Sequence, residues 1–223
     1  MTRKSAPGNY FEDFSVGQTL DHATPRTLNV GDSAWYMALY GSRFVANCSS
    51  EFARAIGFND APLDDFLVFH TVFGKSVPDI SLNAVANLGY ADVRFGAPVY
   101  AGDTISATSS ITGLKQNSSG KTGTVYVATR GTNQRGEDVL AFNRWVMVKK
   151  QYPDSAAPQT IVPTLPSAVT PDSFSLPQAL KPHGFDFVAS GSPHVFEDYA
   201  VGECIDHVDG ITVEESEHMS AAR

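Results

Sequence analysis

Acid–base chemistry is the first possibility that the sequence raises, because aspartate and histidine stand side by side at Asp21-His22 and again at Asp206-His207. A carboxylate and an imidazole can act as a general acid–base pair when both side chains reach the same reacting group. Neighbouring residues on a strand, however, point to opposite faces of the sheet. We therefore predict a structural role for both pairs. A further candidate, His70, lies within an apolar helical stretch and is expected to be a hydrogen-bonded histidine of the core.

The two pairs belong to a segment that occurs twice. Residues 10–22 and 195–207 are identical at seven of 13 positions and begin 185 residues apart. This spacing far exceeds the roughly 20–50 residues of a solenoid repeat, so it indicates a duplicated domain. Residues 151–185 contain seven of the 13 prolines, as in a stiff linker. We predict a complete module at 10–150, a proline-rich linker at 151–190, and the start of a second, incomplete module at 191–223.

The first module opens with residues that favour helices. Asp32 is a suitable N-cap for a helix whose apolar residues recur at helical spacing up to Tyr40. A second short helix is expected at 52–56, where Gly57 can close it. The next stretch, 63–77, is apolar around nearly its whole circumference, and this pattern predicts a helix that is buried on all sides.

Strand patterns follow the helices. From Ala84 onward, apolar strand residues alternate with turn signals at 101–103, 117–120 and 133–136. Helices gathered first and strands gathered afterwards predict an α+β fold, in which an antiparallel sheet wraps one buried helix.

Composition excludes several classes of function. A net charge of −8 gives no basic footprint for nucleic acid, and no apolar run reaches 18 residues, so no membrane span is expected. Cys48 and Cys204 are expected to be reduced thiols, and the six histidines are scattered, so we expect neither a metal nor another cofactor. The first residues lack the apolar region of a signal peptide, which favours a cytoplasmic location.

Several motifs resemble those of the MaoC-like dehydratases, hot-dog-fold proteins that include the R-specific enoyl-CoA hydratases. Phe11–Gly17 is similar to the family's opening strand, and Tyr40–Cys48 is similar to the segment that follows. Phe95–Thr104 resembles the F-x-x-P-V-x-x-G-D-T strand entry, and Asn133–Val139 resembles the N-Q-x-G-x-x-V hairpin. The resemblance implies the first half of a double hot-dog and a hydro-lyase acting on an enoyl-CoA. It is closest to the branch that takes branched C4-dicarboxylic acyl-CoAs, which implies reversible hydration of mesaconyl-CoA to β-methylmalyl-CoA.

Hydration of an enoyl thioester needs a general acid–base pair and preorganised N–H donors for the thioester oxygen. The family supplies the pair from a G-D-x-N-P-[LIV]-H motif. On this sequence the motif falls on residues 41–47, with Ser42 in the aspartate position and Asn47 in the histidine position. Neither side chain exchanges a proton near neutral pH. We therefore expect no catalytic residue in this chain and place the dyad in the second module, beyond Arg223.

The family's helix-start motif, P-x-x-H-G, is altered as well. It falls on Pro62–Phe66, where Asp65 replaces the histidine and Phe66 replaces the close-approach glycine. Two carboxylates, Asp64 and Asp65, would then stand where an oxyanion develops, which is unfavourable for catalysis. The resemblance thus implies that this module mainly holds the substrate.

Three residues are candidates for substrate binding. Arg94 is expected near the family's substrate tunnel, where it could meet a CoA phosphate or a substrate carboxylate, or be an ordinary exposed arginine. Tyr90, four residues earlier, is expected to share its face and either line the acyl pocket or only pack. Asn47 could bind substrate or cap a helix before Ser49. The expected partners are an acyl-CoA and further copies of the chain. Because hot-dog modules pair their sheet edges, the second module is expected to pair with the first within one chain, and homo-oligomers of unknown order are expected in addition.

Two other functions stay open from the sequence. A hot-dog acyl-CoA thioesterase would need a carboxylate near the start of the buried helix, and Asp64 or Asp65 could serve. A non-catalytic acyl-CoA-binding module would explain the missing dyad without any second active site.

Overall fold

The computed structural model describes residues 7–208 and 210–221. The chain forms two compact units, each built from two separate stretches of sequence. The first contains Met1–Asn29 and Leu63–Gln178, and the second contains Val30–Pro62 and Ala179–Arg223. Both cysteines are free thiols. Within the described residues, no helix has the length and apolar character needed to cross a membrane.

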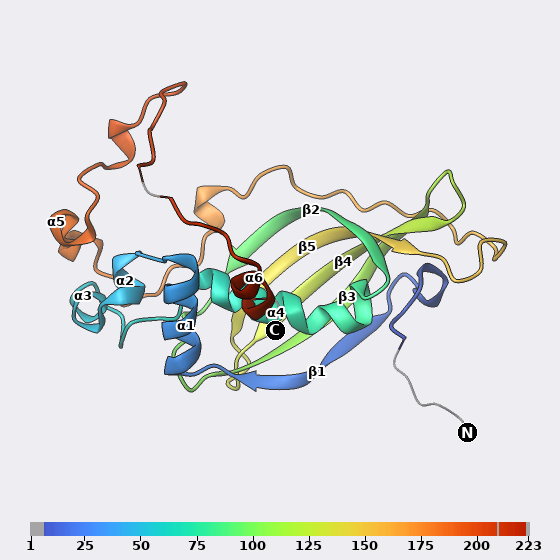
Figure 1. Ribbon diagram of the computed structural model, residues 1–223, viewed down its shortest axis with the longest axis horizontal. Coiled ribbons are helices and arrows are strands. Elements are labelled where there is room, and N and C mark those ends of the chain that lie inside the picture. The colour runs from blue at the N-terminus through green and yellow to red at the C-terminus, as the bar shows by residue number, and fades with distance from the viewer. Residues whose placement is uncertain (1–6, 209, 222–223) are drawn as a thin grey trace. The chain divides into compact units, whose positions relative to one another are not determined.

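The first unit is a five-stranded antiparallel sheet (Figure 1). Its spatial order is β1-β3-β4-β5-β2, so β1 and β2 form the two edges. The strands are β1 (Thr19–Thr27), β2 (Ala84–Phe95), β3 (Thr104–Gln116), β4 (Thr122–Thr132) and β5 (Asp138–Lys149). The strand region predicted from Ala84 onward and its three turns are confirmed. The predicted opening strand at Phe11–Gly17 is wrong, because Phe11–Asp13 form a 3-10 turn (η1) and β1 begins only at Thr19.

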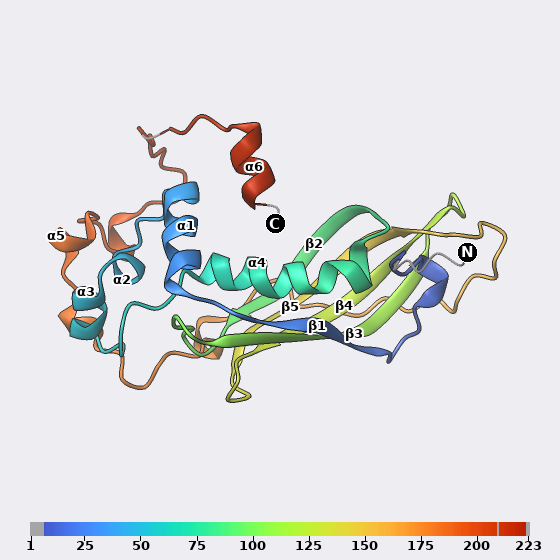
Figure 2. The same ribbon diagram turned by 60° about the horizontal axis from the view of Figure 1, so that its bottom comes forward.

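One long helix, α4 (Asp65–Ser76), lies along one face of this sheet (Figure 2). Its sheet-facing side carries buried Leu67, Val68 and Val72. Gly131 of β4 permits the close approach, because a Cβ there would overlap the Val72 side chain. A π-helical turn, η2 (Val77–Ser81), continues the helix. The predicted α+β arrangement of an antiparallel sheet around one helix is confirmed.

The prediction that this helix is buried on all sides is wrong. The ring of Phe66 is 61% exposed, and His70 and Gly74 lie on the same exposed side. Only one face of α4 contacts the sheet, so apolar residues on the other face remain at the surface. His70 is therefore a surface residue of α4 and not the core histidine that the pattern predicted.

The second unit contains the short helices that precede α4 in sequence. They are α1 (Val30–Tyr40), α2 (Val45–Cys48) and α3 (Ser50–Ala55). The helix expected from Asp32 starts two residues earlier, so Asp32 lies in the first turn and is not the N-cap. The Ser49 hydroxyl caps α3 by accepting a hydrogen bond from the Phe52 N–H at 3.2 Å. Gly57 closes this helix with a φ of 104°.

The chain after β5 has little regular structure. In the first unit, Ile161 forms a two-bond antiparallel bridge with Leu114 of β3, and η3 (Pro171–Ser173) follows. In the second unit, Lys181 donates its N–H to the carbonyl of Ile56 at 2.7 Å. The remaining elements are η4 (Pro182–Gly184), α5 (Phe187–Ser190), η5 (Phe196–Asp198) and α6 (Glu215–Ala221).

Candidate functional site

The start of α4 is the place where the family's chemistry would need free N–H donors. The Asp64 carboxylate caps the helix there and accepts a hydrogen bond from the Phe66 N–H at 2.8 Å. Partial desolvation raises the pKa of Asp65, and the neighbouring Asp64 charge raises it further. A carboxylate already occupies the helix N-terminus, so this end of α4 presents negative charge rather than an oxyanion hole.

Asn47, which stands in the histidine position of the dyad motif, has a structural partner. Its amide Nδ2 donates to the carbonyl oxygen of Pro62 at 2.9 Å, within the second unit. Capping is done by Ser49 itself, so the alternative role of Asn47 as a helix cap is wrong. Neither it nor Ser42 has a side chain that titrates near neutral pH.

Arg94 and Tyr90 do not share a face of the sheet. The register pairs Tyr90 with Arg144 and Arg94 with Ala141, and it shifts between Ala91 and Arg94. Positions 141 and 144 lie an odd number of residues apart on β5, so their side chains point to opposite faces. The expectation of a shared face is wrong, because the irregularity in β2 adds a residue between the two positions.

The guanidinium of Arg94 is already engaged. Its Nε contacts the Asp92 carboxylate at 2.6 Å and its Nη1 donates to the carbonyl oxygen of Ser173 at 3.0 Å. Asp92 has a φ of 52°, which is unusual for a residue other than glycine and coincides with the irregularity. Arg94 therefore ties β2 to the segment that follows β5, on the face away from α4.

Tyr90 belongs to an aromatic cluster on the α4 side of the sheet. Its ring centroid lies 5.6 Å from that of Phe69, 6.4 Å from that of Phe73 and 5.9 Å from that of Phe142. The tyrosine is 38% exposed. Burial raises the pKa of the Tyr90 phenol, although the nearby Arg144 charge acts in the opposite direction. The cluster forms an apolar wall that reaches the surface at the edge strand.

Arg144 lies beside this cluster and is only 1% exposed. Its Nη2 donates to the Ser76 hydroxyl at 2.9 Å, and its Cζ lies 4.6 Å from the centroid of the Phe73 ring. Nε and Nη1 are buried and have no hydrogen-bond partner. Burial lowers the pKa of Arg144 to about 10, so the group still carries its charge at neutral pH.

Sequence reasoning missed Arg144, although a signal was present. The buried residues of β5 alternate through Leu140, Phe142, Val146 and Val148, and Arg144 stands in the same phase. An arginine in the core phase of a strand is unusual, because buried arginines normally have a charged partner. The apolar residues that indicate this strand, Val139, Trp145, Val146 and Val148, belong to both faces, so they do not by themselves assign Arg144 to the core face.

His22 is buried and forms a different polar group. Nδ1 contacts the Asp79 carboxylate at 2.7 Å and Nε2 contacts the Ser109 hydroxyl at 2.7 Å, which in turn lies 2.8 Å from the Thr129 hydroxyl. Asp21 points the other way and accepts a hydrogen bond from Thr108. The predicted separation of Asp21 and His22 onto opposite faces is confirmed. Ser109 is fully buried, so this chain of hydrogen bonds stabilises the core.

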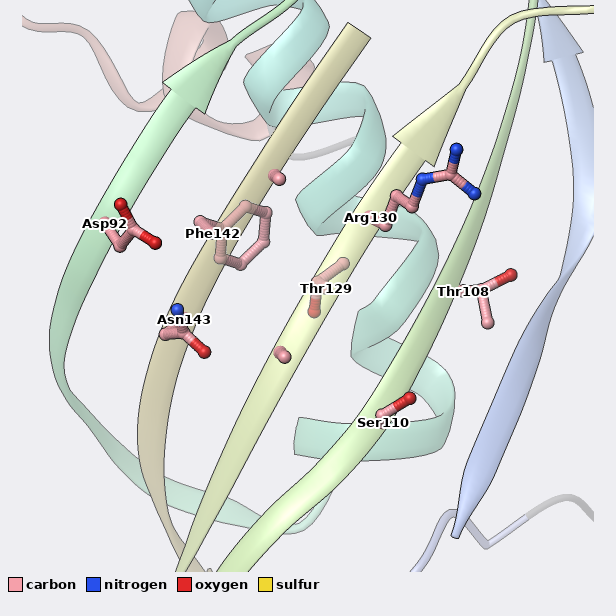
Figure 3. Close-up of a pocket in the computed structure, with 9 residues that line it drawn as sticks. Asp92, Thr108, Ser110, Thr129, Arg130, Phe142 and Asn143 are labelled. Carbon is pink, nitrogen blue, oxygen red and sulfur yellow. The ribbon is translucent and has the colours of Figure 1, made fainter. Parts of the chain in front are cut away.

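A depression of about 330 Å³ lies on the sheet. Figure 3 shows Thr108, Ser110 and Arg130 on the near side, with α4 passing behind the sheet. The depression is open to solvent, and neither the predicted binding residues nor Arg144 line it. Within residues 7–208 and 210–221, no three His, Cys, Asp or Glu side chains come close enough to share a metal ion.

Comparison with known proteins identifies the family. Residues 2–189 match the family model described as mesaconyl-CoA hydratase. The chain belongs to the mesaconyl-CoA hydratase family. It is 55% identical over its full length to a β-methylmalyl-CoA dehydratase of Chloroflexus aurantiacus, of which it covers 63%. It is 53% identical over 220 residues to a mesaconyl-CoA hydratase of Cereibacter sphaeroides, of which it covers 64%. The chain thus spans less than two thirds of the length of these relatives.

Solved structures support the fold of this family member. A MaoC domain dehydratase structure from Chloroflexus aurantiacus matches 99% of the chain with a TM-score of 0.95 and 55% identity, over 63% of its own length. A conserved hypothetical protein of Mycobacterium tuberculosis, described as a double hot-dog, matches 71% of the chain with a TM-score of 0.63 and 26% identity, over 48% of its own length. The predicted hot-dog fold is confirmed.

Two features of the described residues bear on the chemistry of this family. The aromatic cluster and Arg144 combine an apolar wall with a buried positive charge. The start of α4 and the dyad positions supply neither a neutral-pH acid–base pair nor a free oxyanion donor at Phe66.

Proposed function

We propose that the full-length protein reversibly hydrates mesaconyl-CoA to β-methylmalyl-CoA, and that this chain forms mainly the substrate-binding part. The observation that carries the proposal is the match of the whole chain, at 55% and 53% identity, to proteins named for these two directions of one reaction. The occupied helix N-terminus at Asp64 supports the assignment of a binding role to the first module. We propose that the acid–base residues belong to the second module.

The proposed division at 10–150, 151–190 and 191–223 is supported by the repeated segment. Both copies form a 3-10 turn of sequence Phe-Glu-Asp, at Phe11–Asp13 and at Phe196–Asp198. In each, the aspartate accepts a hydrogen bond from the N–H three residues earlier, at 2.8 Å. Phe11 is fully buried, whereas Phe196 is 87% exposed. We infer that Phe196 belongs to a second core of the same kind.

Tyr90 is the predicted binding residue that the geometry favours for lining the acyl pocket, because it lies in the aromatic cluster. Asn47 and Arg94 stay predictions, and each has a structural contact that a ligand would have to displace. We also propose that the second module pairs with an edge of this sheet and that the chain forms further homo-oligomers. The edge strand β2 supports this, since Val85 and Leu88 are 54% and 43% exposed. A cytoplasmic location stays a prediction.

The test is to assay the full-length protein and the 223-residue chain on mesaconyl-CoA. Loss of the conjugated double bond and formation of the hydrated product by mass spectrometry are expected for the full-length protein alone. Comparable turnover by the 223-residue chain would contradict the proposed division of roles. No hydration by the full-length protein would contradict the proposed function.

A thioesterase is the second candidate, and one observation favours it. Asp65 has a raised pKa and stands at the start of α4, where such an enzyme needs a carboxylate. Release of free CoA thiol would identify this activity, because hydration leaves the thioester intact. Binding of acyl-CoA without turnover by the full-length protein would instead identify a non-catalytic module.

A further inference from the structure

Arg144 is a buried cation whose charge has no anionic partner among the described residues. Its Nη2 meets only hydroxyl groups, those of Ser76 at 2.9 Å and Ser81 at 3.5 Å. Nε and Nη1, which carry three N–H groups between them, are buried and unpartnered. An uncompensated buried charge is strongly unfavourable. Buried, unpartnered N–H groups of this kind are expected of an arginine that binds an anionic ligand.

The surroundings limit what that anion can be. The guanidinium stacks over the Phe73 ring and stands opposite Tyr90 in the strand register. Rings of Phe69 and Phe142 pack against Tyr90 in turn. Apolar walls of this kind suit a short carbon chain. The Ser76 hydroxyl, which itself donates to the Phe73 carbonyl oxygen at 2.7 Å, fixes the orientation of the guanidinium.

A carboxylate at the end of a short acyl group fits this site better than a CoA phosphate. A carboxylate is small and planar, and it forms strong charge-assisted hydrogen bonds with guanidinium N–H groups. The low dielectric among aromatic rings strengthens such bonds further. A phosphate carries a large nucleotide with it and needs an open, polar approach. Tyr90, at 38% exposure on an edge strand, marks the side from which a small group would enter.

We propose that Arg144 binds the free carboxylate of a dicarboxylic acyl-CoA and thereby makes the enzyme selective for dicarboxylic over monocarboxylic substrates. This inference rests on the proposed hydratase function and names the residue that recognises the distal end of its substrate. Arg144 is a specificity-determining residue and takes no part in proton transfer. The Ser76 hydroxyl is a positioning group for it.

The first experiment compares Arg144→Met with the unaltered full-length enzyme on mesaconyl-CoA and on tiglyl-CoA, which has a methyl group in place of the carboxylate. Removing a buried charged partner is expected to lower kcat/KM for mesaconyl-CoA on the order of 100-fold, with a change of less than about 3-fold for tiglyl-CoA. Arg130→Met is the matched control, because Arg130 is an exposed arginine paired with Asp138. An equal loss on both substrates would overturn the proposal.

The second experiment separates this proposal from the proposed reaction. Isothermal titration measures binding of two saturated thioesters, methylsuccinyl-CoA and 2-methylbutyryl-CoA, which cannot be hydrated. The unaltered protein is expected to prefer the dicarboxylic ester, and Arg144→Met and Arg144→Lys are expected to lose that preference fully and in part. Loss of hydration activity alone would leave this result unaffected.

Ser76→Ala covers the case in which Arg144→Met fails to fold. It keeps the charge and removes only the hydroxyl that orients the guanidinium, so we expect the preference for the dicarboxylic ester to fall roughly 3- to 10-fold, the worth of one hydrogen bond. Equal affinity of the unaltered protein for both esters would overturn the proposal. That result would assign the Arg144 charge to a carboxylate from another protein segment.

Discussion

Nε2 of His22 lies 2.7 Å from Oγ of Ser109, in a line of hydrogen-bonded polar groups that joins η2 to three strands. The line runs from the Asp79 carboxylate through His22 and Ser109 to the Thr129 hydroxyl. A carboxylate only accepts, so Nδ1 of His22 donates to Asp79. His22 and Ser109, the two inner members of the line, thus each have two hydrogen-bond partners. Buried polar groups stabilise a fold when they are hydrogen-bonded in this way.

His22→Ala is expected to lower the free energy of unfolding by about 2–4 kcal/mol, because it leaves a cavity and removes one of the two side-chain hydrogen-bond partners of the buried Ser109 hydroxyl. Denaturant unfolding followed by circular dichroism measures the change. Asp21→Ala is the matched control, since Asp21 is exposed on the other face, and its effect is expected to stay below about 1 kcal/mol. Similar losses for both variants would contradict the assigned role of His22.

The lowered pKa of the Asp103 carboxyl predicts that the stability of the fold depends on pH. Burial alone would raise the pKa of this carboxyl, but hydrogen bonds from the Tyr100 N–H, Gln134 and Arg135 outweigh it and lower the pKa. A carboxyl with a lowered pKa stabilises the fold above its unfolded pKa of about 4, and this contribution is lost as the pH falls through the folded pKa.

Asp103→Asn places an NH2 group against existing donors, so we expect a loss of about 1–3 kcal/mol at pH 7. The difference in free energy of unfolding between the variant and the unaltered protein should be constant between about pH 6 and 8 and should shrink below about pH 4. Thermal unfolding across this range measures it. Asp138→Asn, at an exposed ion pair, is the control and should change little. A difference that grows in acid would refute the assignment.

Local chemistry made part of this fold predictable. The start of α4 beside Asp64 and the turns at 117–120 and 133–136 depend on residues that are adjacent in sequence, and they lie where expected. The faces of Tyr90 and Arg94 depend on the irregular pairing of β2 with β5, which no short stretch of sequence encodes. The exposed side of α4 likewise depends on how much of the helix the sheet can cover.

The site was less predictable than the fold for a related reason. Asn47 stands in a motif position, and Arg94 and Tyr90 lie just before the Phe95–Thr104 motif, whereas no motif points to Arg144. Its environment arises from α4, η2 and β5 together, through Ser76, Phe73 and Ser81. Such a juxtaposition becomes visible only when these elements are packed.

The N-cap of α4 can be tested directly. Asp64→Ala removes the acceptor of the Phe66 N–H and is expected to destabilise the protein by about 0.5–2 kcal/mol. Asp64→Asn keeps a capping oxygen, so its cost should be only a few tenths of a kcal/mol beyond the loss of charge at the helix N-terminus. Urea unfolding compares the two. Equal losses for the two variants would show that the charge, which both remove, and not the capping oxygen stabilises this end of α4.

Substitution of Gly131 in β4 and of Gly74 in α4 by alanine is expected to change stability in opposite directions. A Cβ at position 131 would overlap Val72, so Gly131→Ala is expected to cost about 1–3 kcal/mol through overpacking. A Cβ at position 74 meets nothing within 4 Å, and Gly74→Ala should stabilise α4 by about 0.5–1 kcal/mol. Thermal unfolding of the two variants measures opposite shifts. A stabilising Gly131→Ala would mean that α4 does not approach the sheet as closely as described.

The repeated Phe-Glu-Asp turn gives a test of the second module. Phe11 is fully buried beside Gly123, so Phe11→Ala is expected to cost about 3–5 kcal/mol in any chain that contains the first module. Phe196 is 87% exposed, and Phe196→Ala should change the stability of the 223-residue chain by less than about 0.5 kcal/mol.

In the full-length protein, Phe196 would enter a second core, and the same substitution should cost nearly as much as Phe11→Ala. Denaturant unfolding of both variants in both chains measures this, and a neutral Phe196→Ala in the full-length protein would contradict the proposed duplication.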